Sequence, residues 1–95
     1  DLTIGISYDA DIRQARDLMK GILDSDERVL KDPAYAIFVS ELADSSVNFS
    51  VRAWVNSSDL LQFKSDLLEK VKYTFDENGV GIPYPQMDVH LSKED

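Results

Sequence analysis

Ninety-five residues are enough for one small domain, and their composition excludes several classes of protein. The chain is 43% hydrophobic and 29% charged, so it can form a core, and its formal net charge is −8. That acidity argues against nucleic acid as a partner, because binding to phosphates depends on Lys and Arg, and it disfavours direct contact with anionic lipid. The absence of cysteine rules out disulfides and thiolate chemistry.

The first part of the chain predicts a strand, a helix and a polar connection. Apolar residues alternate over residues 2–8, as in a strand with one dry face. Asp11, followed three residues later by glutamine, is a capping-box pattern. Helical spacing then relates the apolar residues Ile12, Ala15, Leu18, Met19, Ile22 and Leu23. From the connection at 24–33, Val29 and Leu30 are expected to pack against the core.

Two further strands are predicted at residues 35–42 and 46–55, joined by a turn at 43–45. The face of the third strand expected to meet the helices carries Val47, Phe49, Val51, Ala53 and Val55. Its other face carries Arg52 and Trp54. Together with an aromatic side chain of the second strand, Phe38 or Tyr35, these residues form a candidate contact surface. The alternative, isolated aromatics on a solvated sheet, remains open.

A second helix begins after residues 56–59, which supply its N-terminus, and ends at Asn78-Gly79. Its apolar stripe consists of Leu60, Phe63, Leu67, Val71 and Phe75. This order of elements predicts an α+β domain over residues 1–80, a ferredoxin-like β-α-β-β-α sandwich with both helices on one face of an antiparallel sheet.

Residues 81–95 are predicted to form a tail that extends from this domain. Pro83 and Pro85 should stiffen an extended spacer. The strand expected next, from Gln86 to Leu91, alternates Met87 and Val89 with Asp88 and His90. No strand follows it, so it must pair either with the domain's own sheet or with copies of itself from other chains.

A search for chemistry gives no catalytic residue, no cofactor site and no metal site, and we expect no enzymatic activity. His90 is the only histidine, whereas zinc sites usually draw on several His or Cys residues. Asp24 and Asp26 resemble the start of a calcium loop, but Val29 and Tyr35 stand where glycine and glutamate are needed. The glycines at 79 and 81 follow a helix, unlike those of a dinucleotide fingerprint.

Four blocks of sequence, taken in order, resemble the C-terminal cytoplasmic domain of the small-conductance mechanosensitive channel (MscS) family. The blocks are residues 4–9, residues 28–33, residues 42–49 with 51–54, and the segment GIPYPQMDV at 81–89. The resemblance implies that several copies, a heptamer, surround a cage below a membrane pore. It also implies that residues 86–91 close the cage floor as a parallel barrel, with one strand from each subunit.

The resemblance places the domain on the cytoplasmic side of the inner membrane, in a channel that releases solutes on hypo-osmotic shock. The pore-forming membrane region would lie upstream of Asp1, and we expect the chain to have been excised from a longer protein. Within the barrel Met87, Val89 and Leu91 should point inward and Asp88 and His90 outward. A small-ligand-sensing regulatory domain is the alternative. A metal-sensing domain would need more than one histidine.

Overall fold

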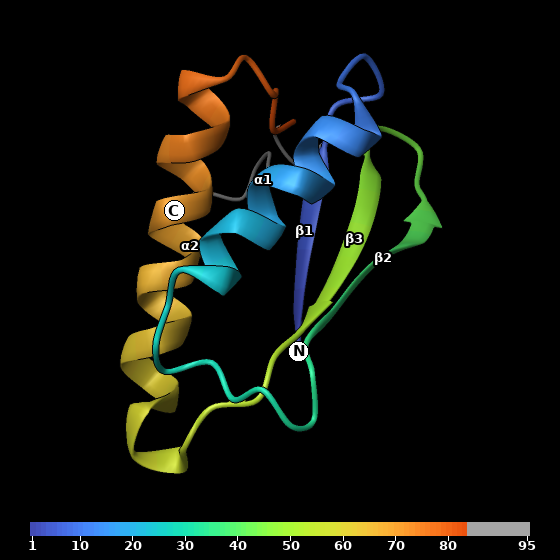
Figure 1. Cartoon of the computed structure of the whole chain (residues 1–95). Helices are drawn as coiled ribbons and strands as arrows, with labels where there is room; N and C mark the ends of the chain where they lie inside the picture. The colour runs from blue at the N-terminus through green and yellow to red at the C-terminus, as the bar shows by residue number, and fades with distance from the viewer. Residues whose placement is uncertain (84–95) are drawn as a thin grey trace, which may run out of the picture.

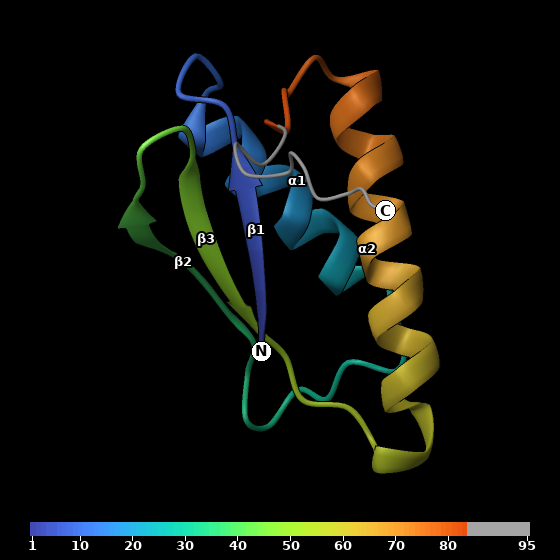
Figure 2. The same ribbon diagram turned by 180° about the vertical axis from the view of Figure 1, so that it is seen from behind.

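The computed structural model describes residues 1–83 and arranges them as a sheet covered by two helices (Figures 1 and 2). In chain order the elements are β1 (Leu2–Ile6), α1 (Ile12–Asp24), β2 (Ala36–Leu42), β3 (Val47–Arg52), the 3₁₀ turn η1 (Ser57–Asp59) and α2 (Leu60–Glu77). The strands lie in the order β1-β3-β2 and are antiparallel. The predicted α+β fold is therefore confirmed. The strand predicted at 86–91 lies outside the described residues.

The strand register assigns each side chain to one face of the sheet. β3 is the central strand, and its Phe49 lies opposite Ile4 of β1 and Val39 of β2. Phe49 is fully buried beneath the helices. The core around it joins β1 and β3 to both helices, and Ile37 and Val39 of β2 pack against it while partly buried. It consists of Ile4, Ile6, Ala15, Met19, Ile22, Leu23, Val47, Phe49, Val51, Phe63, Leu67, Val71, Phe75 and Val80.

The start of α1 confirms the predicted cap and corrects the predicted box. The Asp11 carboxylate accepts hydrogen bonds from the backbone nitrogens of Arg13, at 2.8 Å, and Gln14, at 3.2 Å. In a complete capping box the Gln14 side chain would return to the Asp11 backbone. It donates instead to the carbonyl of Asn78, at 3.2 Å, just beyond α2. Gln14 thus joins the start of α1 to the end of α2.

Three sequence predictions at one end of the domain are wrong in detail. The third strand ends at Arg52 and not at residue 55, because the chain turns there to meet the connection after α1. The backbone nitrogen of Leu30 donates to the carbonyl of Trp54 at 2.7 Å. Val29 packs against the core as expected, but Leu30 is 36% exposed. Leu60, the first residue of α2, is 53% exposed, so the buried stripe begins at Phe63.

Arg28 fastens the connection between α1 and β2 to the second helix. Its guanidinium donates two hydrogen bonds to Asp26, at 3.0 and 2.8 Å, and one to Asp66 of α2, at 3.0 Å. The same group lies 5.4 Å from the ring centroid of Phe63. The bond from Arg28 holds the pKa of Asp26 below its ordinary value. Bonds from Gln62 and then Arg28 lower the pKa of Asp66.

The end of α2 is a Schellman motif. Gly79 has φ of +74°, its nitrogen donates to the carbonyl of Asp76 at 3.4 Å, and the nitrogen of Val80 donates to that of Phe75 at 2.9 Å. Val80 is buried, which supplies the apolar contact that accompanies this motif. The stop predicted at Asn78-Gly79 is therefore confirmed, and the chain turns back toward the sheet.

We expect Gly79→Ala to destabilise the domain by about 1 kcal/mol, because a Cβ disfavours this left-handed conformation. Gly21→Ala is the matched control. Gly21 lies inside α1, and a Cβ there would meet no atom within 4 Å, so this change should stabilise by up to about 1 kcal/mol. Urea unfolding monitored by circular dichroism measures both variants. Equal effects of the two substitutions would contradict the assigned role of Gly79.

We expect the Arg28 contacts to make stability depend on acid pH. Folded-state pKa values below the ordinary 3.8 mean that the stabilisation from Asp26 and Asp66 is present above about pH 4 and is lost as pH falls through the lowered values. Arg28→Met should reduce this acid-side loss of unfolding free energy. Lys72→Met is the control, since it removes an exposed pair with Asp76. Denaturant titrations between pH 2 and 6 measure the effect, and an unchanged acid limb in Arg28→Met would refute it.

Candidate functional site

The face of the sheet away from the helices carries a small aromatic and cationic group. Arg52 of β3 and Phe38 of β2 both lie on this face by register. The Arg52 guanidinium is 5.4 Å from the centroid of the Phe38 ring, a cation–π distance. Its Nε atom is also 3.4 Å from a carboxylate oxygen of Asp1. These contacts hold Arg52 over the sheet while half of its side chain stays exposed.

The structure separates the other aromatic candidates for this surface. Trp54 lies two residues beyond the end of β3 and is 41% exposed. Tyr35 does not join the surface, because its side chain packs against the core. Phe38 is thus the second-strand aromatic on the open face. The use of Arg52 and Trp54 as a contact surface stays a prediction.

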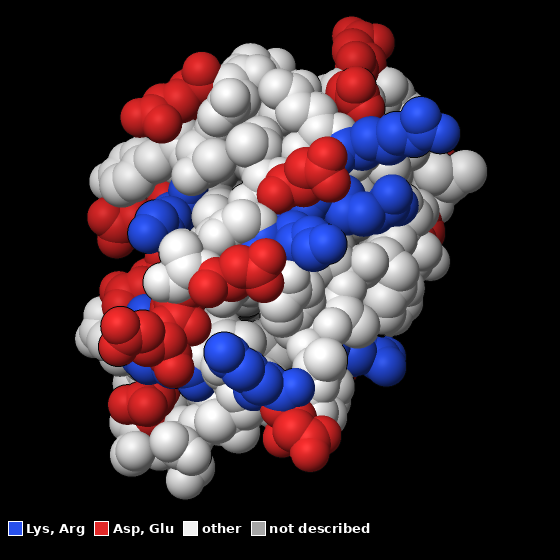
Figure 3. All heavy atoms as spheres, in the orientation of Figure 1, with Lys and Arg blue, Asp and Glu red and all other residues white. Residues whose placement is uncertain are grey.

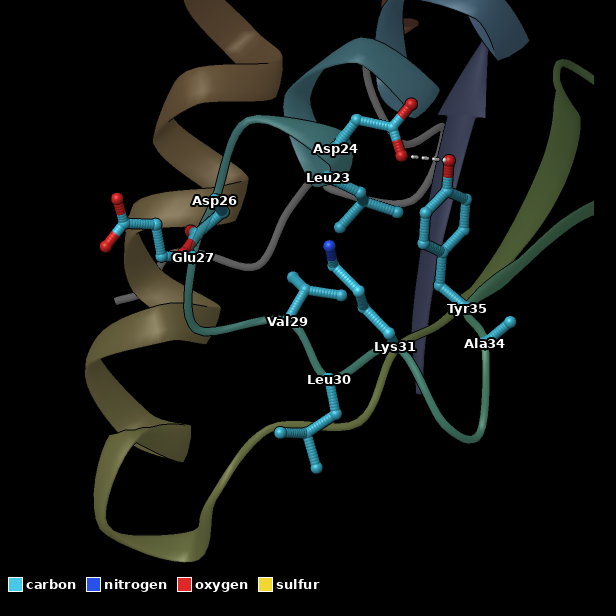
Figure 4. A pocket seen from close by; sticks show the side chains of 9 residues that line it. All are labelled: Leu23, Asp24, Asp26, Glu27, Val29, Leu30, Lys31, Ala34 and Tyr35. Carbon is cyan, nitrogen blue, oxygen red and sulfur yellow. Dashed lines mark hydrogen bonds between the residues drawn. The ribbon is translucent and has the colours of Figure 1, made fainter.

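A hollow of about 380 Å³ lies between the end of α1 and the start of β2 (Figure 4). Its lining residues are Leu23, Asp24, Asp26, Glu27, Val29, Leu30, Lys31, Ala34 and Tyr35. The Tyr35 hydroxyl donates to the Asp24 carboxylate at 2.7 Å. Partial burial and then this carboxylate raise the pKa of Tyr35 to about 12, so its proton stays in the bond at neutral pH.

Most charged groups around this hollow already have partners within the domain. Asp24 is bound to Tyr35, and Asp26 is bound to Arg28. In Figure 4 the Glu27 side chain points away from the hollow, whereas the Lys31 ammonium points into it. The arrangement offers an apolar floor and one cation, but no nucleophile beside a base. Sequence reasoning missed the hollow because Asp24 and Tyr35 share no periodic pattern.

The start of the predicted spacer is fixed against Ser7, the residue that follows β1. The backbone nitrogen of Ser7 donates to the carbonyl of Gly81 at 2.9 Å. A Cβ at Gly81 would stand 2.7 Å from the Ser7 hydroxyl oxygen, so the two backbones approach closely because residue 81 is glycine. Of the two spacer prolines, Pro83 is the last described residue. Pro85 and the strand residues Gln86, Met87, Asp88, Val89, His90 and Leu91 lie outside the described part, and their predicted roles stay predictions.

Within residues 1–83 the structure contains no group of three or more His, Cys, Asp or Glu side chains placed to hold a metal ion. In the same part of the chain, neither helix combines the length and apolarity required to cross a bilayer.

Comparison with known proteins gives a consistent result along the chain. The family described as "Mechanosensitive ion channel MscS, C-terminal" matches residues 1–82. An uncharacterized MscS family protein from Synechocystis is 45% identical over 96% of this chain and 31% of its own length. The small-conductance mechanosensitive channel of Edwardsiella ictaluri is 43% identical over 96% of this chain and 32% of its own length.

The closed-state crystal structure of Helicobacter pylori MscS is similar in fold, with a TM-score of 0.82 and 26% identity. The match covers 98% of this chain and 37% of that one. The chain thus spans about a third of the length of the curated relatives named above. On the family match and the sequence identities together, the chain belongs to the MscS family of mechanosensitive channels and corresponds to its C-terminal domain.

Proposed function

We propose that this domain is the cytoplasmic cage and assembly domain of a mechanosensitive ion channel. The observation that carries the proposal is the family match over residues 1–82, which includes nearly every described residue. In the full-length protein, an upstream region would form the pore in the inner membrane. The channel would release solutes on hypo-osmotic shock, with this domain on the cytoplasmic side.

The geometry after α2 supports an assembly role for the end of the chain. The Schellman motif at Gly79 and the bond from Ser7 to Gly81 set the position from which the spacer starts. Pro83 and Pro85 then restrict the backbone that follows. In a ring, a fixed starting point in each copy would bring residues 86–91 of neighbouring copies side by side. We propose a homo-heptamer closed by a parallel barrel of these strands.

The described residues favour this structural role over an enzymatic one. Arg28, Tyr35 and Asp24, the polar groups with the most specific contacts, are bound to partners inside the domain and serve its packing. No ionisable side chain of residues 1–83 is fully buried, whereas burial is the commonest way to shift the pKa of a catalytic group. We therefore propose that the domain serves as a filter and a scaffold, without catalysis and without a cofactor.

The barrel proposal predicts a difference between two neighbouring substitutions. Val89→Lys should disrupt the ring, because several ammonium groups would converge in a narrow barrel interior. His90→Lys, on the opposite side of the same strand, should leave the ring intact. The masses of the purified full-length assemblies and cell survival after hypo-osmotic shock measure the two effects.

A second pair of variants tests which side chains of the strand face the barrel interior. Cysteine at Val89 should be protected from a thiol reagent in the assembled channel, and cysteine at Asp88 should react. The reverse result would invert the facing. A full-length protein that remains monomeric in the membrane would overturn the proposed function itself.

A further inference from the structure

Three cations on α1 form a stripe that has no ion pair with a carboxylate within residues 1–83. Arg13, Arg16 and Lys20 follow one another at spacings of three and four residues, so they share one face of the helix. The ion pairs found within residues 1–83 use Arg28, Arg52 and Lys72 as their cations. Figure 3 shows several blue side chains over α1, with red side chains beside them. We call Arg13, Arg16 and Lys20 the cationic stripe.

Packing holds the middle of this stripe in place. The Arg16 guanidinium lies 5.9 Å from the ring centroid of Phe49, and Phe49 is the fully buried centre of the sheet. Arg13 and Lys20 on either side are exposed. The acidic residues of α1 are Asp17 and Asp24, and neither lies within ion-pair distance of the stripe. The positive charge is therefore available to a group outside the domain.

The outward side of α2 carries four carboxylates among three exposed lysines, Lys64, Lys70 and Lys72, so its carboxylates are in a small excess. Helical spacing places its carboxylates on the side away from the buried stripe that runs from Phe63 to Phe75. We call these residues the acidic face: Asp66, Glu69, Asp76 and Glu77. Red side chains gather along the α2 side of the molecule in Figure 3. Two members have internal partners, since Asp66 is bound to Arg28 and Asp76 to Lys72. Glu69 and Glu77 have no ion pair within residues 1–83.

A separation of charge within each copy would reduce the repulsion between identical acidic copies in a ring. Each copy carries a formal charge of −8, so neighbouring copies repel one another unless opposite charges meet locally. A ring uses a head-to-tail interface in which two different patches of the same chain face each other. A cationic patch on one helix and an acidic patch on the other satisfy this requirement.

We propose that the cationic stripe of each copy docks on the acidic face of α2 in the neighbouring copy. The proposal rests on the ring assembly put forward above. It adds a second contact between neighbouring copies, in the cage wall, to the proposed pairing of residues 86–91. The partner is therefore another copy of this chain.

Cysteine cross-linking in the full-length, membrane-embedded protein tests the contact directly. The 95 residues contain no cysteine, so introduced thiols in this domain meet no native one. Lys20→Cys combined with Glu69→Cys should give a ladder of covalent oligomers on oxidation, because each copy then links to both neighbours. Lys31→Cys combined with Glu69→Cys is the matched control and should give no ladder. A ladder in both pairs, or in neither, would overturn the proposal.

Charge reversal gives an independent measurement that does not disturb Arg16 and its packing. Arg13→Glu with Lys20→Glu should weaken association roughly tenfold at low salt, and adding Glu69→Lys with Glu77→Lys should restore it. Lys31→Glu with Lys64→Glu changes the charge equally and should have a smaller effect. The difference should vanish near 1 M salt, where screening acts within about 3 Å.

The outcomes separate this proposal from the proposed function. A wild-type ring that tolerates Arg13→Glu with Lys20→Glu as well as it tolerates the control would refute the docking contact and leave the assembly role standing. Failure of the charge-swapped variant to recover would also refute this pairing of surfaces. Absence of any wild-type ring would refute both proposals.

Discussion

The rest of the structure depends on the burial of β3 under the two helices. β3 is the central strand, and Phe49 on its inner face has no exposed surface. Phe75 of α2, which is equally buried, belongs to the same core. A domain of this size buries only about 60–65% of its unfolded surface, so loss of either ring would remove a large fraction of its net free energy of unfolding. This packing also fixes where each surface lies, because the buried residues of α1 and α2 hold both helices against the sheet.

The two ends of α2 show how the core directs the more variable parts of the chain. At the end of the helix, Val80 is buried with the core, and the left-handed Gly79 turns the backbone toward Ser7. Closer to its start, Asp66 holds Arg28 and with it the connection after α1. Each anchor joins a loop to a helix that is itself held by apolar packing. Polar contacts therefore determine where the loops lie, and the core determines whether the domain folds.

Periodic and local signals in the sequence were enough to predict the main elements of this fold. The spacing of apolar residues identified both helices, and Asp11 and Gly79 marked two of their ends.

Contacts between segments far apart in the chain could not be predicted from local patterns. Gln14 binds Asn78 and Arg28 binds Asp66. The sequence around Gln14 and around Arg28 gives no indication of these partners. The third strand was predicted too long for the same reason, since its end depends on the bond between Leu30 and Trp54. Leu60 is exposed because it is the first residue of α2. Its spacing correctly predicts the side of the helix on which it lies, but not whether that end of the helix is covered.

The proposed assembly combines two contacts with different physical character. Pairing of the terminal strands would depend on backbone hydrogen bonds and a filled barrel interior, neither of which is sensitive to salt. The contact between the cationic stripe and the acidic face would be electrostatic and exposed, so it should be individually weak and screened over about 8 Å at physiological ionic strength. A weak contact repeated around a ring can still select the order and orientation of the copies, because like charges face each other in the wrong arrangement. Since the proposed contact between the helices is electrostatic and the proposed strand pairing is not, changes in ionic strength would act mainly on the cage wall.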